Sequence, residues 1–126
     1  MGMPRKSRSQ TITESAKQTS RLVHRRLPTH RPPTHPGEML EEEFLKPLRI
    51  SQSAFAARLG VSFVRLHEIV RKKRGVSADT ALRLAQVTGM SADFWLGLQS
   101  DWDLWHALRS PQGRQITKLE PIRRPA

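Results

Sequence analysis

The sequence predicts an all-α protein in which five helices form one domain and two basic tails are disordered. Apolar residues recur at spacings of three and four through the central part of the chain, which is the period of a helix with one buried face. Serine precedes several of these segments, and proline or glycine follows them, as is typical where helices begin and end. No segment alternates between apolar and polar residues for long enough to indicate a β-strand.

Composition limits the chain to a small protein of a reducing compartment. Its 126 residues can bury one modest core. The absence of cysteine excludes a disulfide framework and a thiolate metal site. No run approaches the roughly 18 apolar residues of a membrane span, and the first residues lack the apolar core of a secretory signal. We therefore expect a cytoplasmic protein without a membrane anchor.

Positive charge lies mainly at the two ends of the chain. Lys and Arg outnumber acidic residues by 8 to 1 in residues 1–35 and by 4 to 1 in residues 110–126, but only by 10 to 9 between these segments. Such tails attract phosphate backbones without reading a base sequence. The first could equally be a solvated extension without function, or translated sequence upstream of the natural start. The predicted boundaries are 1–34 for a disordered basic extension, 35–109 for the helical domain and 110–126 for a basic tail.

The first predicted helix begins at Pro36 and ends before Pro47. Proline suits the first turn of a helix, where its missing N–H group is not needed, and Glu38 lies near the positive end of the helix dipole. A proline further along disrupts a helix, so we expect Pro47 to stop this one. Three apolar residues share the inward face: Leu40, Phe44 and Leu45.

The next two helices are predicted over residues 52–59 and 63–72. Ser51 and Ser62 precede them as candidate N-caps, since a serine hydroxyl can accept a hydrogen bond from an N–H group of the first turn. An apolar pair lies on one face of each helix, and the two faces can close on a shared core. These pairs are Phe55 with Leu59 and Leu66 with Ile69.

Two small residues distinguish this helix pair from an ordinary helical hairpin. Ala56 lies where two steeply crossing helices bring their backbones close, so a larger side chain would separate them. Gly60 follows the last apolar residue of the first helix, where the backbone commonly turns left-handed and a Cβ atom would clash. A hairpin would share the Leu and Ile pattern but would not need these residues. Residues 51–70 therefore indicate a helix-turn-helix motif that binds DNA.

The fourth predicted helix follows a basic turn, RKKRG, that ends at Gly75. Ser77 caps this helix and Gly89 terminates it. We expect its core face to contain Ala81, Leu82, Ala85 and Val87.

The fifth predicted helix opens at Ser91 and carries an aromatic stripe. Apolar residues recur along it at spacings of three and four: Trp95, Leu98, Trp102, Trp105 and Leu108. The helix either continues to Ser110 or breaks near Gly97 and Ser100. Trp95, with Phe94, is expected to pack inside the domain.

Four short motifs are more specific than the helix-turn-helix alone: HPGE, EEFLKPL, ADTALRLA and FWLGLQSDWDL. With them, residues 35–104 resemble the HigA/VapI-type antitoxins, a branch of the phage-repressor-like (XRE, Cro/C1) helix-turn-helix superfamily. The resemblance implies a five-helix, lambda-repressor-like domain that binds its own promoter on double-stranded DNA as a homodimer. It also implies a HigB/RelE-like partner toxin, a ribosome-dependent mRNA endonuclease.

The resemblance assigns DNA contacts to the second helix of the motif and its flanks. In repressor-like domains the N-terminal end of this helix enters the major groove. The family more often carries proline and glutamine at the positions of Phe63 and Val64, so its usual base contacts cannot be transferred to this chain. Their side chains could make only apolar contacts, such as those with thymine methyl groups. Arg65 and Arg71 could pair with guanine or phosphate. The full predicted set is Gln52, which resembles a phosphate-binding glutamine, Phe63, Val64, Arg65, His67 and Arg71, with Lys72, Lys73 and Arg74 either near phosphates or in a merely solvated turn.

Three residues of the aromatic stripe lie beyond the usual five-helix core: Trp102, Trp105 and Leu108. A single short helix has little against which to bury them, so they are predicted to form a dimer interface or a toxin-binding surface. A dimer also suits operator binding, because two recognition helices must lie about 34 Å apart on one face of DNA.

The sequence does not indicate an enzyme, a cofactor or a metal site. Three consecutive glutamates, Glu41 to Glu43, splay around a helix and cannot converge as a set. No two of His24, His30 and His35 have the spacing that would place them on one helix face as metal ligands. Two alternatives to the antitoxin remain: a stand-alone XRE-family repressor without a toxin, and an interaction module whose helix no longer reads bases.

Overall fold

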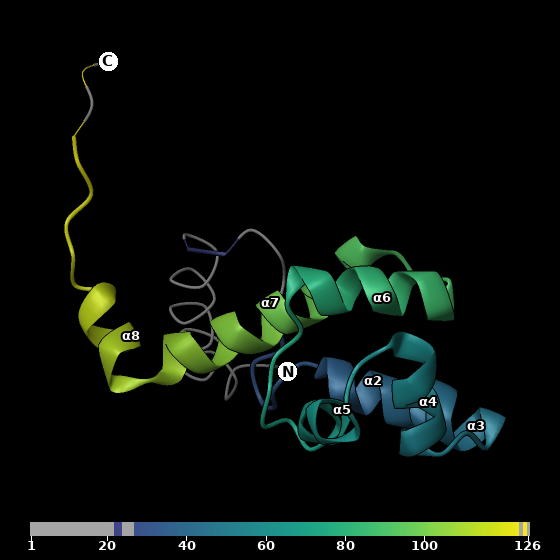
Figure 1. Cartoon of the computed structure of the whole chain (residues 1–126). Coiled ribbons are helices and arrows are strands. Elements are labelled where there is room, and N and C mark those ends of the chain that lie inside the picture. The colour runs from purple at the N-terminus through teal and green to yellow at the C-terminus, as the bar shows by residue number, and fades with distance from the viewer. Residues whose placement is uncertain (1–21, 24–26, 124, 126) are drawn as a thin grey trace, which may run out of the picture. The chain divides into compact units, whose positions relative to one another are not determined.

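The computed structural model describes residues 22–23, 27–123 and 125, and within them it contains helices and turns but no β-strand (Figure 1). This confirms the predicted all-α class. None of the helices in the described residues is both long and apolar enough to cross a bilayer. The elements are α2 (Pro36–Leu40), a π-helical turn η2 (Glu41–Leu45), α3 (Lys46–Leu48), α4 (Gln52–Leu59), α5 (Phe63–Val70), α6 (Ala78–Thr88), α7 (Ala92–Arg109) and α8 (Pro111–Ile116).

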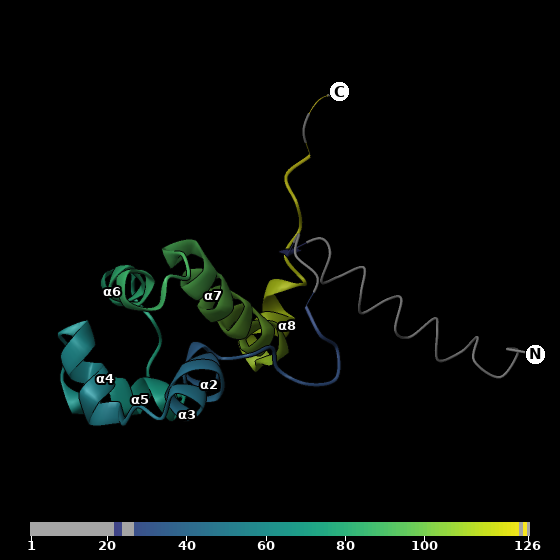
Figure 2. The same ribbon diagram turned by 90° about the vertical axis from the view of Figure 1, so that its right-hand side faces the viewer.

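The described residues divide into two compact units. The larger unit covers Pro32–Asp103, and the smaller one combines residues before Pro32 with those from Leu104 onward. Within the larger unit, α2 to α5 form one layer and α6 with the first part of α7 forms a second (Figures 1 and 2). The buried core between the layers consists of Leu40, Leu45, Phe55, Ala56, Leu59, Leu66, Ile69, Val70, Val76, Ala81, Leu84 and Trp95.

Pro47 does not stop the first helical segment, so that prediction was wrong. The helical segment continues through α3 and ends only at Arg49, whose φ of 54° is left-handed. In an α-helix the proline ring would clash with the carbonyl group four residues earlier. Here the preceding turn is π-helical, with the Lys46 N–H bonded to the Glu41 carbonyl five residues earlier, and this wider turn accommodates the proline.

The helix-turn-helix pair forms as predicted. Ser51 Oγ accepts a hydrogen bond from the Ala54 N–H, and Ser62 Oγ accepts one from the Arg65 N–H, each at 3.1 Å. Gly60 ends α4 with a left-handed φ of 73°. The second helix of the pair, α5, ends two residues earlier than predicted, because Lys72 also adopts a left-handed φ, 63°.

The inward face of α6 differs from the predicted one. Leu82 is 64% exposed and Val87 is also exposed, whereas Leu84 is fully buried. Ser77 caps the helix by accepting a hydrogen bond from the Thr80 N–H. Leu84 lies four positions after Thr80 and three after Ala81, so these three residues share the buried face. The predicted terminator Gly89 does end the helix, with a φ of 81°.

The last predicted helix, α7, continues without a break past Gly97 and Ser100 to Arg109. It is followed by α8, which lies in the segment predicted to be a disordered tail. Ser110 caps α8, and a Cβ atom on Gly113 would lie 2.1 Å from the Ala107 carbonyl oxygen, so α8 packs directly against the end of α7. Most of the predicted N-terminal extension lies outside the described residues.

Candidate nucleic-acid interface

The N-terminal end of α5 presents apolar side chains to solvent. Phe63 is 48% exposed and Val64 is 62% exposed, whereas the apolar residues further along α5 are buried. The Phe63 ring stacks on the His67 ring, with 5.4 Å between centroids and 16° between planes. His67 Nδ1 lies 3.0 Å from Gln52 Oε1, so α4 and α5 contribute to one surface. This surface combines apolar edges with hydrogen-bonding groups, as base recognition in a major groove requires.

Arg65 is directed toward α6 instead of away from the domain. Its Nη2 atom donates a hydrogen bond to Thr80 Oγ1 and lies 3.2 Å from Asp79 Oδ2. The side chain is only 31% exposed. The Asp79 and Thr80 contacts occupy Nη2 of Arg65 and direct its guanidinium toward α6, whereas Phe63 and Val64 are largely exposed.

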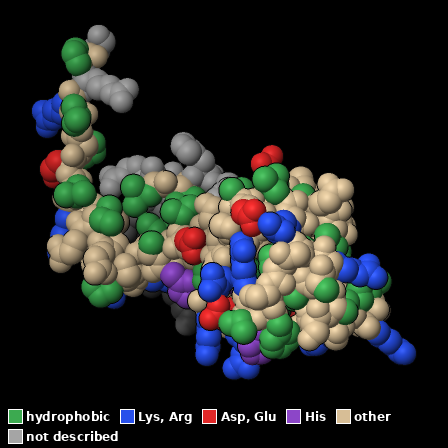
Figure 3. Space-filling model, in the orientation of Figure 1, with side chains coloured by type: hydrophobic (Ala, Val, Ile, Leu, Met, Phe, Trp, Pro, Cys, Tyr) green, Lys and Arg blue, Asp and Glu red, His purple; other side chains and the backbone are tan. Residues whose placement is uncertain are grey.

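The four cations after α5 alternate between paired and projecting side chains. Lys72 Nζ lies 3.4 Å from Glu38 Oε1, and the Nε and Nη2 atoms of Arg74 each lie 2.8 Å from Glu68 Oε1. Within the described part of the chain, no carboxylate pairs with Arg71 or Lys73. Lys and Arg side chains gather around α5 in Figure 3. The projecting pair, Arg71 and Lys73, is available for phosphate groups.

Two residues that the sequence reasoning missed hold the turn of the motif. Arg83 Nη1 donates hydrogen bonds to the Leu59 carbonyl at 2.9 Å and to the Gly60 carbonyl at 3.3 Å, so α6 caps the end of α4. Arg83 Nε also bonds Asp79 Oδ2 at 3.0 Å, and this contact, with a smaller contribution from Arg65, holds the pKa of the Asp79 carboxyl below its ordinary value. Their spacing of four on one helix was the available sequence signal.

Known proteins share this arrangement. Residues 42–95 match the helix-turn-helix family. Virulence-associated protein I of Dichelobacter nodosus is 48% identical over 85 residues, covering 68% of this chain and 79% of that protein. An HTH-type transcriptional regulator of Haemophilus influenzae is 40% identical over 75 residues, covering 60% of this chain and 70% of the regulator. The structure of Pseudomonas aeruginosa antitoxin HigA with the higBA promoter has a TM-score of 0.66 and 45% identity, covering 71% of this chain and 98% of HigA.

The chain belongs to the HigA/VapI-type antitoxins. This family is a branch of the XRE helix-turn-helix superfamily, and its all-helical fold is the one found here. Among the residues that the structure describes, no three His, Asp or Glu side chains form a group that could hold a metal ion.

In this HigA-type chain the HPGE motif contacts the C-terminal end of α5. His35 Nδ1 caps α2 by accepting a hydrogen bond from the Gly37 N–H at 2.9 Å. A Cβ atom on Gly37 would lie 2.0 Å from the Ile69 carbonyl oxygen, so the α2 and α5 backbones are in direct contact. Glu38 then pairs with Lys72 beyond the end of α5. The motif thus fixes the C-terminal end of α5.

The aromatic stripe of this HigA-type chain has more intramolecular partners than the sequence predicts. In the larger unit, Trp102 packs edge-on against His35, with 4.9 Å between centroids, and Lys72 Nζ lies 5.6 Å from the centroid of its ring. In the smaller unit, Trp105 Nε1 donates a hydrogen bond to the Pro28 carbonyl at 2.7 Å. The expectation that the stripe had little to pack against was therefore wrong.

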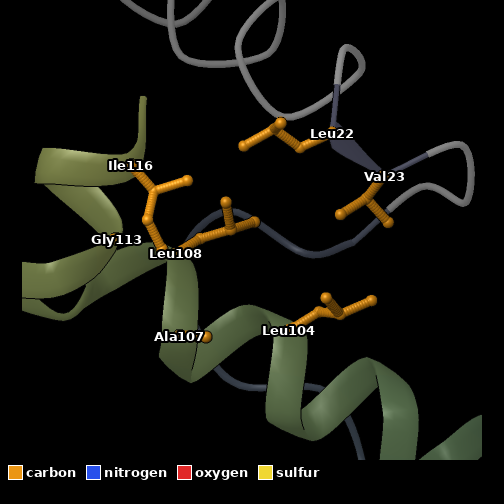
Figure 4. A pocket seen from close by; sticks show the side chains of 7 residues that line it. All are labelled: Leu22, Val23, Leu104, Ala107, Leu108, Gly113 and Ile116. Atoms are coloured by element: carbon orange, nitrogen blue, oxygen red, sulfur yellow. The ribbon is translucent and has the colours of Figure 1, made fainter. Parts of the chain in front are cut away.

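Leu108 belongs to an apolar cavity within the smaller unit. The cavity has a volume of about 160 Å³, and Figure 4 shows side chains from α7, α8 and the N-terminal segment turned toward it. Its lining consists of Leu22, Val23, Leu104, Ala107, Leu108, Gly113 and Ile116. Both tails that the sequence predicted to be disordered thus contribute packed residues.

Proposed function

We propose that this protein is a DNA-binding antitoxin that represses its own operon as a homodimer and neutralises a HigB/RelE-like toxin. The observation that carries the proposal is the exposed N-terminal end of α5, in a chain similar to a HigA antitoxin solved with its promoter. The proposal involves binding without a catalytic step and places the protein at the nucleoid in the cytoplasm.

The α5 surface divides into reading and anchoring residues in this proposal. Phe63 and Val64 contact thymine methyl groups in the major groove, and His67 with Gln52 supplies hydrogen bonds to a base edge or a nearby phosphate. Arg71 and Lys73 bind the phosphate backbone. Arg65, Lys72 and Arg74 contribute positive charge near the DNA, but their ion pairs give them a structural role first.

The second half of α7 is the proposed dimer or toxin surface. Trp102, Trp105 and Leu108 are each partly exposed in addition to their intramolecular contacts. A second copy seated there would give two α5 helices, as binding to a palindromic operator requires. Alanine at both Trp102 and Trp105 is expected to lower the molecular mass in solution and the promoter affinity. If neither quantity changes, this surface is not the interface.

Fluorescence anisotropy tests the DNA-binding part of the proposal. The probe is a duplex from the region upstream of the gene, compared with a scrambled duplex at several salt concentrations. We expect a preference of about 10³-fold for the native duplex that persists near physiological salt. Equal affinities that both collapse with salt would mean that only non-specific phosphate contacts are made, and the assignments on α5 would be withdrawn.

A stand-alone repressor is the second candidate, because one similar protein is named only as an HTH-type transcriptional regulator. The two candidates differ in their partner, so the discriminating experiment is co-purification with the product of the adjacent gene. A small basic protein of about 90 to 110 residues bound to the chain would support the antitoxin. Operator binding without such a partner would support the stand-alone repressor.

A further inference from the structure

A buried polar side chain of α7 is joined to the backbone of the basic loop between α5 and α6. Gln99 is 9% exposed. Its Oε1 atom accepts a hydrogen bond from the Val76 N–H at 2.9 Å, and its Nε2 atom donates one to Asp103 Oδ1 at 3.0 Å. These partners fix the amide orientation, because the N–H can only donate and the carboxylate can only accept.

The loop is packed closely against this amide. A Cβ atom on Gly75 would lie 3.1 Å from the Gln99 side-chain carbon and nitrogen, a tight contact that glycine avoids. The adjacent Val76 side chain is buried in the core. Three contacts therefore hold the C-terminal end of the loop. They are the hydrogen bond from the Val76 N–H to Gln99, the close approach of Gly75 to the Gln99 side chain, and the burial of the Val76 side chain in the core.

The same helix also holds the other end of the loop. Trp102, three residues after Gln99, lies under the Lys72 ammonium group, and Glu38 pairs with that group from α2. Lys72 has a left-handed φ of 63°, which a residue with a Cβ atom rarely adopts unless its surroundings hold it there. Between these two fixed points lies Lys73, one of the two cations of residues 71–74 that have no carboxylate partner among the described residues.

We propose that Gln99 is a positioning residue for DNA binding: it fixes the backbone of the basic loop, so that Lys73 and Arg71 meet the phosphate groups in a preset arrangement. The inference rests on the proposed DNA-binding function. Fixing a loop before binding removes the cost of ordering it on the DNA, and affinity rises without any new contact. Gln99 itself touches no DNA in this scheme.

The test uses the full chain with Gln99→Leu, which keeps a similar volume and removes both hydrogen bonds. We expect the affinity for the native duplex to fall roughly tenfold, and the slope of log K against log salt to become shallower by about 1, as when one phosphate contact is lost. Hydrogen exchange at the Val76 amide is expected to accelerate. Unchanged affinity, slope and exchange in a folded variant would overturn the proposal.

A charge-neutral swap separates positioning from mere packing. In Gln99→Glu combined with Asp103→Asn, the new carboxylate can accept from both the Val76 N–H and the Asn side chain, and the net charge is that of the original pair. We expect this double variant to recover most of the affinity and the Val76 protection. If Gln99→Leu binds DNA more weakly and the double variant recovers neither the affinity nor the Val76 protection, the effect is due to packing and the proposal is overturned.

Two further measurements keep the result decisive. Lys73→Ala is expected to weaken binding less in the Gln99→Leu background than in the original chain, and full additivity of the two changes would contradict the coupling. Should Gln99→Leu fail to fold, Asp103→Ala removes the orienting partner at an exposed position, with an expected loss of roughly threefold and faster exchange at Val76. If the original chain does not prefer the native duplex over the scrambled one, the proposed function is refuted. Hydrogen exchange at the Val76 amide then still shows whether Gln99 holds the loop.

Discussion

The two ends of α5 are built for different tasks. At the N-terminal end, Phe63 and Val64 are exposed to solvent, and the Phe63 ring stacks on the His67 ring. At the C-terminal end, the helix touches the backbone of α2 at Gly37, and Lys72 just beyond it contacts Glu38 and Trp102. Substitutions at the exposed end therefore leave the packing of the helix intact, whereas those at the other end disturb the contacts that keep the helix in place.

The largest expected effect follows from enlarging Gly37 at the anchored end. In Gly37→Ala the new Cβ atom would lie 2.0 Å from the Ile69 carbonyl oxygen, and neither backbone can yield without moving a helix. We expect a loss of about 3 kcal/mol in the free energy of unfolding, measured in urea. Gly97→Ala is the matched control, because among the described residues no atom beyond its chain neighbours and the adjoining helix backbone lies within 4 Å of the position that its methyl group would take. Helix propensity alone then favours a gain of about 0.5–1 kcal/mol. Equal stabilities of the two variants would refute the backbone contact.

The next effect is expected at the exposed end. Phe63→Ala removes apolar surface that is largely open to solvent, so the free energy of unfolding is expected to change by less than about 0.5 kcal/mol. Affinity for the native duplex is expected to fall roughly tenfold. Replacing individual thymines by uracil in the duplex removes only methyl groups, and Phe63→Ala is expected to be insensitive to the replacement that weakens the original chain most. Equal sensitivity would mean that Phe63 reads no methyl group.

A smaller effect distinguishes the projecting cations from the paired ones. Lys73→Ala is expected to reduce the salt dependence of DNA binding by about 0.9 in the log–log slope, because one phosphate contact is lost. Arg74→Ala is the matched change one residue later, where the side chain is bound to Glu68. It is expected to leave the slope nearer its original value. The reverse order would show that the ion pair opens on DNA.

The smallest effect concerns the acidic residue that ties α6 to α5. The pKa of Asp79 is lowered in the folded chain, chiefly by Arg83, so its contribution to stability is fully present above the ordinary value of 3.8 and is lost as the pH falls below it. Urea unfolding of the original chain and of Asp79→Asn is therefore expected to converge as the pH is lowered from about 5 toward about 3. A constant difference over that range would exclude the ionised carboxylate as its source.

Local patterns in the sequence were sufficient to predict the helix-turn-helix, although α5 ends two residues before its predicted limit. Ser51, Ser62 and Gly60 act through hydrogen bonds and backbone angles within a few residues, and α4 has the predicted bounds. Gly37 and Gly113 were not recognised as sites of close packing, since the carbonyl groups that they approach belong to other helices. The prediction for α6 also failed in part, because periodicity identified a helix but did not decide whether Leu82 or Leu84 faced the core.

The sequence by itself determined the all-α class, because helical periodicity is a local property, and the family, because its motifs are short. The resemblance to that family then indicated which end of α5 faces outward. Only the tertiary structure decided which cations of the RKKR segment remain available. Glu38 and Trp102 lie far from Lys72 in opposite directions along the chain, and they meet it only after folding. Whether a charged side chain is paired or remains available depends on its neighbours in space. The sequence therefore showed that the segment is basic, but not which of its side chains are free of carboxylate partners.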